Sequence, residues 1–305
     1  MAKFELNILG CGSATSTLKH LPSSQILDIR DNLFMIDCGE GAQLQMRRMK
    51  VKFTRLNHIF ISHLHGDHCF GLPGLLSTMA LLGRTGVVTV HIFEDGAEQF
   101  SNILNYFSRD MPYKVEFNII KVGKKIIYED DAITVTTLPL RHSLPSVGFL
   151  FQEKAKKRHI NSEMTNYHQV PRYMMEALRS GEDYVTPAGV VIPNKILTKN
   201  ADAVTSYAYI SDTKFSQRVI NSIEGVDWLY HEATYAKDME VQARKRFHST
   251  TIDAATVAKE AHAKHLILGH FSNRYNDSEI LVKEAREIFP DTIAANEGMR
   301  IEMVK

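Results

Sequence analysis

Short apolar runs alternate along this chain with polar turns and with stretches whose apolar residues recur at a helical period. In the first half these runs have the length and composition of buried strands, and polar residues follow directly after most of them. We predict strands at residues 4–9, 33–37, 58–61, 87–93 and 133–138, and helices at 43–49, 72–82 and 96–108. This alternation of strands and helices predicts a layered α/β fold.

The pattern changes between about residues 153 and 205. This segment is basic at first and then polar and rich in tyrosine, with one clear helix predicted at 170–180. From residue 207 the α/β pattern resumes, with strands predicted at 207–210, 228–231 and 265–268 and helices at 252–262 and 277–288. We therefore expect a single domain over residues 1–305, built from two related halves, with residues 153–205 as an inserted arm.

Four side chains of metal-binding types follow the strand predicted at 58–61, namely His63, His65, Asp67 and His68. Neutral imidazoles suit borderline ions such as zinc, and a carboxylate also accepts harder ions. Gly66 permits the tight turn that lets side chains on either side of it converge. We expect the first two histidines to bind one ion and Asp67 and His68 a second. Histidines gathered here by chance are the alternative, but this spacing is uncommon.

Two ions held close together need more ligands than this loop supplies, including one carboxylate to bridge them. Three further candidates each follow a predicted strand: His142, Asp212 and His270. Taken alone, Asp212 can instead cap a helix that begins near Lys214, and either histidine can be an ordinary surface residue. Because all three stand after strands in a chain that already needs ligands, we favour the metal-binding interpretation.

Composition and charge narrow the class of protein. Hydrophobic residues make up 44% of the chain, enough for a substantial core, and no apolar run approaches the roughly 20 residues of a membrane helix. The amino terminus has a strand pattern rather than that of a secretory signal, and three cysteines are an odd number for a disulfide framework. We therefore expect a soluble, cytoplasmic protein with reduced thiols and no membrane partner.

The net charge of +1 creates no overall attraction for nucleic acid, so an anionic partner must be recognised by local basic patches. One such patch opens the predicted arm and consists of Lys154, Lys156, Lys157 and Arg158. Another lies at residues 244–246, shortly before His248. Each patch on its own is also compatible with an ordinary solvated face.

The metal-type residues and the segments around them resemble the metallo-β-lactamase superfamily and, within it, the ribonuclease Z family. The matching segments span nearly the whole chain in the family's order and lie at residues 9–15, 37–43, 63–68, 71–74, 211–213, 231–234, 248–250 and 269–275. The resemblance implies an αββα sandwich with an inserted exosite arm, usually a homodimer. It also implies an endoribonuclease that removes the 3′ trailer from precursor transfer RNA.

The same resemblance implies a role for each site residue. His63, His65 and His142 would bind one Zn²⁺ ion, Asp67, His68 and His270 a second, and Asp212 would bridge them, with Mn²⁺ or Mg²⁺ as alternative metals. The residues implied in catalysis are Asp67, which orients or deprotonates the nucleophile, His248 as general acid or phosphate contact, Glu232 as its partner, and Thr213 and Arg274 near the scissile phosphate. A surface ion pair is the alternative for Arg274.

The arm departs from the family's pattern, because it lacks a clear Gly-Pro pair, and residues 93–96 read Phe-Glu-Asp-Gly where the family has Tyr-Gly-Pro. In the family the arm grips the transfer RNA elbow, which implies that Lys154, Lys156, Lys157 and Arg158 contact backbone phosphates. The alternative function is a phosphodiesterase of the same superfamily acting on small substrates. Two further alternatives are disfavoured. An inactive RNA-binding module would lack metal ligands or His248, but this chain has all of them. A diiron redox protein would have a carboxylate in place of His65.

Overall fold

The computed structural model describes residues 3–303, and the other residues of the expected 1–305 domain lie outside this range. The described chain divides into two compact units, a smaller one at residues 153–205 and a larger one made of the residues before and after it. Each unit has buried apolar residues of its own.

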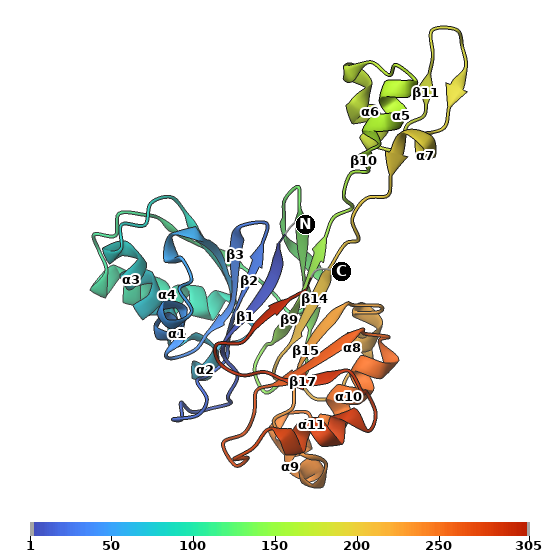
Figure 1. The fold of residues 1–305 in the computed structure, drawn as a ribbon. Coiled ribbons are helices and arrows are strands. Elements are labelled where there is room, and N and C mark those ends of the chain that lie inside the picture. Colours follow the sequence, from blue (N-terminus) through green and yellow to red (C-terminus); the bar gives the residue numbers. More distant parts are fainter. Residues whose placement is uncertain (1–2, 304–305) are drawn as a thin grey trace. The chain divides into compact units, whose positions relative to one another are not determined.

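The larger unit is built on two seven-stranded sheets (Figure 1). The first sheet has the order β18-β1-β2-β3-β4-β5-β6 and consists of β1 (Phe4–Gly10), β2 (Ser24–Ile29), β3 (Asn32–Cys38), β4 (Leu56–Phe60), β5 (Val88–Ile92), β6 (Val115–Ile119) and β18 (Arg300–Glu302). The second has the order β17-β16-β15-β14-β9-β8-β7 and consists of β7 (Lys125–Glu129), β8 (Ile133–Pro139), β9 (Val147–Glu153), β14 (Ser206–Ile210), β15 (Trp228–Glu232), β16 (His265–Gly269) and β17 (Thr292–Ala294). Strands β3 to β6 run parallel in the first sheet, as do β14 to β17 in the second.

The two sheets pack face to face through aromatic side chains. The ring of Phe60 on β4 lies with its centroid 5.5 Å from that of Phe149 on β9, and Phe34 on β3 lies 6.1 Å from Phe151. Because successive side chains of a strand point to opposite faces, Phe34 faces this inner core while Met35 belongs to the outer one. Both faces of β3 are therefore buried, which explains why its sequence reads as a continuous apolar run.

Helices cover the outer face of each sheet (Figure 1). On the first sheet lie α1 (Ala42–Arg48), η1 (Phe53–Arg55), α2 (Gly66–Cys69), α3 (Leu72–Leu81) and α4 (Glu94–Phe107). On the second lie α8 (Gln217–Ser222), α10 (Thr251–Glu260) and α11 (Glu279–Arg286), while α9 (Glu240–Arg246), which follows η3 (Lys237–Met239), lies beyond α11 at the end of the unit (Figure 1). Helix α10 begins with a capping box, in which Thr250 and Asp253 each accept a hydrogen bond from the other's backbone N–H.

Helix, sheet, sheet and helix layers make up the larger unit, which confirms the predicted αββα architecture. The strands predicted at 33–37, 228–231 and 265–268 correspond to β3, β15 and β16. Sequence analysis did not predict β2, β6, β7 or β17, because their apolar residues are interrupted by polar ones or form runs too short to stand out. It also missed β9, although residues 147–151 form an apolar run. None of the helices in residues 3–303 combines the length and apolar character that a membrane span requires.

The smaller unit holds more regular structure than the single helix predicted for it. It consists of β10 (His159–Ile160), α5 (Ser162–Tyr167), η2 (Arg172–Met174), α6 (Met175–Arg179), β11 (Tyr184–Val185), β12 (Val191–Ile192), α7 (Asn194–Leu197) and β13 (Thr198–Lys199). The helix predicted at 170–180 is thus a 3₁₀ turn followed by α6. A small core of its own, with Leu178 and Leu197 fully buried, holds these elements together.

Candidate metal centre and active site

The seven side chains predicted to bind metal lie together in the larger unit, just beyond the ends of strands. His63 and His65 follow β4, His142 follows β8, Asp212 follows β14 and His270 follows β16. Strands β14, β15 and β16 are parallel, so their carboxyl ends meet at one edge of the sheet. A cavity of about 1030 Å³ opens there, lined by His65, Asp67, His142, Asp212 and His270 among others. These candidates, far apart in sequence, therefore share one site.

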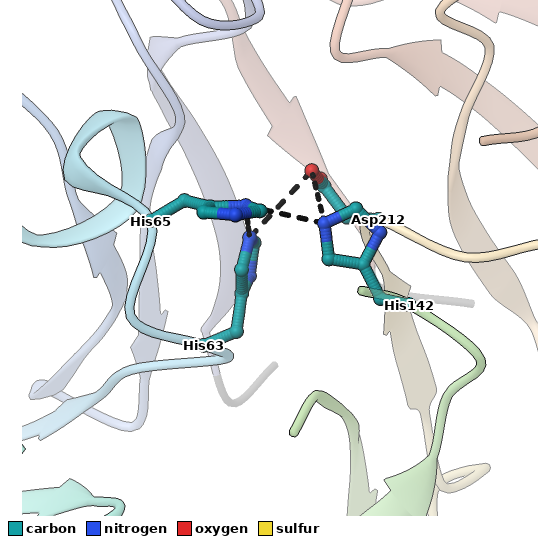
Figure 2. Close-up of side chains that lie close together, drawn as sticks. All are labelled: His63, His65, His142 and Asp212. Atoms are coloured by element: carbon teal, nitrogen blue, oxygen red, sulfur yellow. Dashed lines mark hydrogen bonds and ion pairs between the residues drawn. The ribbon is translucent and has the colours of Figure 1, made fainter. Parts of the chain in front are cut away.

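A first cluster consists of His63, His65, His142 and Asp212 (Figure 2). His65 Nδ1 lies 3.0 Å from His63 Nε2 and 3.1 Å from His142 Nε2. Oδ2 of Asp212 lies 3.6 Å from His63 Nε2 and 3.7 Å from His142 Nε2. Three ring nitrogens and one carboxylate oxygen thus converge on one point.

A second cluster consists of Asp67, His68 and His270. The Nε2 atoms of His68 and His270 lie 3.3 Å apart. Oδ2 of Asp67 is 3.6 Å from the first of these nitrogens and 3.5 Å from the second. The turn at Gly66 separates this cluster from His63 and His65, as the sequence led us to expect.

Asp212 lies between the two clusters, with one oxygen directed to each. Oδ2 faces the first cluster, whereas Oδ1 lies 3.3 Å from His68 Nε2 and 3.1 Å from His270 Nε2. It does not cap a helix, because α8 begins at Gln217 and Ser216 occupies its N-cap position. The surface interpretation of the histidines is also wrong, because the side chains of His142 and His270 are only 2% and 1% exposed.

The hydrogen bonds behind the clusters show which nitrogen of each imidazole is free. The Ser62 hydroxyl donates to Asp37 and therefore accepts from His63 Nδ1, and the Thr234 hydroxyl donates to Glu232 and accepts from His270 Nδ1. His68 Nδ1 donates to Asp37, and His142 Nδ1 donates to the carbonyl of Phe247. In all four rings Nδ1 thus carries a proton, which makes Nε2 the nitrogen that can bind an ion in the clusters.

Electrostatics also favour a cation here. Burial lowers the pKa of His63 well below its ordinary value, and it lowers that of His65 and His142 as well, so these rings are neutral. Burial opposes ionisation of Asp212, but the adjacent His270 and His68 keep its pKa well below the usual range. Neutral imidazoles combined with buried carboxylates form a donor set that fits divalent cations.

Asp37 is a buried residue for which the sequence alone predicted no role, although it belongs to the matching segment at 37–43. It ends β3 with a left-handed backbone (φ 55°) and is fully buried. Its Oδ2 accepts hydrogen bonds from His68 Nδ1 at 2.7 Å, Tyr209 Oη at 2.8 Å and Ser62 Oγ at 2.9 Å. The signal in the sequence is an aspartate at the end of an apolar strand, directly before a Cys-Gly turn.

His248 and Glu232 form a pair at the cavity wall. Nδ1 of His248 lies 3.0 Å from Oε1 of Glu232, which is fully buried. Burial lowers the pKa of His248, but the charge of Glu232 and its hydrogen bond outweigh this and raise it to about 9. The imidazole is therefore protonated at neutral pH and has Nε2–H left to donate to a molecule in the cavity.

Thr213 and Arg274 are placed differently from each other. Thr213 is buried, and its hydroxyl donates to the Lys214 carbonyl and accepts from the backbone N–H of Arg141. The backbone N–H of Thr213 donates to the Glu232 carboxylate. Thr213 thus contacts the partner of His248 rather than the cavity. Arg274 does line the cavity, with its guanidinium carbon 5.2 Å from the centre of the Tyr235 ring.

In the smaller unit, the predicted RNA-binding cations Lys156, Lys157 and Arg158 have partners within the unit. Lys156 pairs with Glu153 at 2.9 Å and its side chain is only 13% exposed, Lys157 pairs with Glu176, and Arg158 Nε donates to Thr198 Oγ1 at 2.7 Å. Lys154 is half-buried. Four other cations of this unit are exposed, namely Arg172, Arg179, Lys195 and Lys199.

Solved structures share this fold over nearly the whole chain. The short form of human tRNase Z is 21% identical, with a TM-score of 0.72 over 99% of this chain and 100% of that one. The metallo-beta-lactamase fold protein YhfI from Bacillus subtilis is 18% identical, with a TM-score of 0.70 over 98% and 99%. At these identities the likeness shows the fold, which is that of the metallo-β-lactamases.

Sequence relatives are much more similar. The chain is 52% identical to a ribonuclease Z of Parabacteroides distasonis over 99% of this chain and 100% of that protein, and 49% identical to a ribonuclease Z of Porphyromonas gingivalis (strain W83) with the same coverage. The model of the family described as anti-Pycsar protein Apyc1 matches residues 4–169. The chain therefore belongs to the ribonuclease Z family, and its residues 4–169 fall within the family that the Apyc1 model describes.

Proposed function

We propose that this protein is an endoribonuclease that removes the 3′ trailer from precursor transfer RNA by metal-dependent hydrolysis and leaves a 3′ hydroxyl on the transfer RNA. One observation carries the proposal: the buried Asp212 carboxylate turns one oxygen to each of two histidine clusters at the floor of an open cavity. Such a shared carboxylate suits two-metal hydrolysis of a phosphodiester. Membership of the ribonuclease Z family supports precursor transfer RNA as the substrate.

Two Zn²⁺ ions suit these donor sets, with Mn²⁺ or Mg²⁺ as alternatives. His63, His65 and His142 would hold the first ion, Asp67, His68 and His270 the second, and Asp212 would be shared. Ions bound in this way supply a water of lowered pKa and neutralise charge on the phosphoryl oxygens.

The residues around the clusters position the substrate and move protons. Oδ2 of Asp67 accepts the N–H of Ala14 at 2.7 Å, which leaves Oδ1 to orient or deprotonate the attacking water. His248 is protonated and held through Nδ1 by Glu232, so Nε2–H can protonate the departing 3′ oxygen. Thr213 supports this pair through its hydrogen bond to Glu232 rather than by touching phosphate.

Phosphate binding would fall to cations that line the cavity. Arg274 is held over the ring of Tyr235, and Lys245 and Arg246 lie in the last turn of α9. A guanidinium can bind a phosphate through two parallel hydrogen bonds, whereas an ammonium acts as a compact charge. These three cations would orient the RNA backbone over the clusters.

Residues 153–205 would form the inserted arm that binds transfer RNA outside the cavity. The exposed cations Arg172, Arg179, Lys195 and Lys199 suit backbone phosphates better than Lys156 and Arg158, whose polar groups already have partners within the unit. The predicted contacts of Lys154 and Lys157 are part of the same proposal.

A homodimer is also part of the proposal. A hydrogen bond between the hydroxyls of Ser77 and Ser108 joins the middle of α3 to the carboxyl end of α4. At the carboxyl ends of these helices Leu81, Tyr106 and Phe107 are 88%, 70% and 77% exposed. An apolar surface of this kind suits contact with a second copy. Light scattering on the protein and on a Leu81→Ser, Phe107→Ser variant would test it, because the variant should be monomeric if this face is the interface.

Cytoplasmic localisation is also part of the proposal, because the bacteria of the reported relatives make precursor transfer RNA in the cytoplasm.

The test is cleavage of a 3′-extended transfer RNA transcript by metal-stripped protein, with Zn²⁺ or Mn²⁺ restored. We expect metal-dependent release of the trailer, a 3′ hydroxyl on the product, and loss of cleavage in the Asp212→Ala variant. A small phosphodiester assayed in parallel addresses the alternative function. Turnover of the small diester without cleavage of the transcript would overturn the transfer RNA proposal in favour of a phosphodiesterase acting on small substrates.

A further inference from the structure

A third group of metal-type side chains lies outside both catalytic clusters. Cys11 follows β1, His20 belongs to the loop before β2, and Glu297 stands in the segment before β18. Cys11 is fully buried and His20 is 9% exposed. The proposed hydrolytic mechanism uses none of these three residues.

The ligand-type atoms of this group lie close enough together to surround one ion. Cys11 Sγ lies 3.5 Å from His20 Nδ1 and 3.6 Å from Glu297 Oε1, and His20 Nδ1 lies 3.0 Å from Glu297 Oε2. Ligands at zinc bond lengths in a tetrahedron lie roughly 3.3–3.6 Å apart, which matches the 3.5 Å between Cys11 Sγ and His20 Nδ1. The hydrogen-bonded pair Nδ1–Oε2, now 3.0 Å apart, would open by a few tenths of an ångström around the ion. The carbonyl oxygen of Ala295, 3.3 Å from the same sulfur, is placed to be a fourth ligand.

We propose that Cys11, His20 and Glu297 bind a structural Zn²⁺ ion, separate from the catalytic clusters. The thiol would release its proton to solvent as the sulfur–zinc bond forms, and the S–H hydrogen bond to Ala295 would break. The proton that His20 Nδ1 now donates to Glu297 Oε2 would move to Nε2, which frees Nδ1 for the metal and keeps the ring neutral. Thiolate, carboxylate and Zn²⁺ together are neutral, which removes the cost of burying a charge. Sulfur, imidazole and carboxylate are all ligands that zinc accepts.

This ion would connect the loop between β1 and β2 with the segment before β18. Oε1 of Glu297 already accepts the N–H of Leu21 at 2.8 Å and of Cys11 at 3.3 Å, which leaves Oε2 for the metal. The same loop carries Ala14, whose N–H donates to Asp67 at the edge of the catalytic cavity. The site would therefore hold in place a loop that contacts the second catalytic cluster.

Cobalt substitution tests the proposal without an activity assay. The catalytic clusters offer only nitrogen and oxygen, so thiolate-to-cobalt charge-transfer absorption in the near ultraviolet can come from this third site but not from them. We expect this absorption in the Co²⁺-loaded full-length protein, its loss in Cys11→Ser, and one equivalent of cobalt fewer per chain in that variant. Cys69→Ser is the matched control, because Cys69 is buried close to His65, and it should keep the absorption.

A second variant covers the case in which Cys11→Ser does not fold. Glu297→Gln keeps the side-chain volume, and its amide oxygen can still accept from the N–H of Leu21. We expect this variant to bind cobalt at the third site, measured by the charge-transfer absorption, at least tenfold more weakly. Two results would overturn the proposal: no such absorption in cobalt-loaded protein, or absorption that survives Cys11→Ser. In either case Cys11, His20 and Glu297 would hold the loop by hydrogen bonds alone. This outcome is independent of transfer RNA cleavage.

Discussion

Nδ1 of His68 lies 2.7 Å from Oδ2 of Asp37, and both side chains are fully buried. The carboxylate holds the proton of His68 on Nδ1 and so directs Nε2 to the second cluster. Replacing Asp37 with asparagine removes the charge that fixes this tautomer, and outer contacts of this kind change metal affinity by about 10–100-fold. We expect Asp37→Asn to bind zinc more weakly by about this factor in a competition titration against a chelator.

Tyr209→Phe provides the control for Asp37. It removes one of the donors to the same carboxylate at 2.8 Å but leaves the hydrogen bond with His68. We expect its zinc affinity to fall less than that of Asp37→Asn. Equal affinity in wild type and Asp37→Asn, with the fold intact by circular dichroism, would contradict the role given to Asp37.

His248→Ala is predicted to slow cleavage of precursor transfer RNA by about 10²–10⁴-fold, the usual contribution of a general acid. The zinc content should not change, because Nδ1 of His248, although only 4.0 Å from Asp212 Oδ2, is hydrogen-bonded to Glu232 at 3.0 Å and so is not free to bind an ion. A good leaving group needs no proton, so hydrolysis of bis-p-nitrophenyl phosphate should fall much less. Equal losses on both substrates would indicate that His248 binds phosphate instead of protonating the leaving oxygen.

Sequence patterns predicted most strands that have a long apolar run bounded by clear turns, although they missed β9 with its apolar run at residues 147–151. They predicted β3, β4 and β16 but not β7, whose residues are half-exposed, nor the short β17. In the smaller unit the elements are only two to six residues long, and a periodic pattern cannot develop over such lengths. Tertiary packing, which a single sequence does not display, decides these elements.

The candidate site was predictable for a related reason. Metal-type residues stand directly after strands, and a parallel sheet brings those strand ends to one edge. What the sequence could not display was which groups hold the ligands from behind. Asp37 and Thr234 contact His68 and His270 across 31 and 36 residues, and the burial of Thr213 depends on partners elsewhere in the chain. Similarly, a basic run such as 154–158 does not reveal that several of its members have partners within its own unit.

The exposed cations of the smaller unit lead to a prediction about binding. Arg172→Ala combined with Lys195→Ala should raise KM for precursor transfer RNA and leave kcat unchanged, because these residues are not in the cavity. The slope of log affinity against log salt should fall by about 0.7–1 for each phosphate that the variant no longer neutralises. The measurement is steady-state cleavage and filter binding across a salt series.

A matched control removes the same charge elsewhere. Lys259 and Lys283 are exposed lysines on α10 and α11 of the larger unit, and replacing both with alanine should leave KM and the salt slope nearly unchanged. Hydrolysis of a small diester should be the same in all three proteins. If the control variant weakens binding as much as the Arg172, Lys195 variant, the smaller unit has no special role in binding.

Two histidines remote from the metal clusters, the buried His91 and the half-buried His58, predict how stability depends on pH. The Asn118 side-chain amide donates to His91 Nδ1 at 2.8 Å, so the proton of His91 is on Nε2, 3.3 Å from His58 Nδ1. Burial lowers the pKa of His58 to about 4 and that of His91 to about 3. Both rings are neutral in the folded protein, whereas in the unfolded chain they titrate near 6.5.

Between pH 6.5 and about 4 the unfolded chain therefore binds more protons than the folded protein, and stability must fall as the pH falls through this window. Each such proton contributes a slope of about 1.4 kcal/mol per pH unit. In urea unfolding at a series of pH values, His91→Gln should be less stable than wild type at pH 7.5 but lose stability less steeply toward pH 4. Subtracting the free energy of unfolding of one protein from that of the other at each pH removes the contribution of the histidines that the two proteins share. Parallel curves would mean that His91 takes up a proton in the folded protein and is not held neutral by its partners.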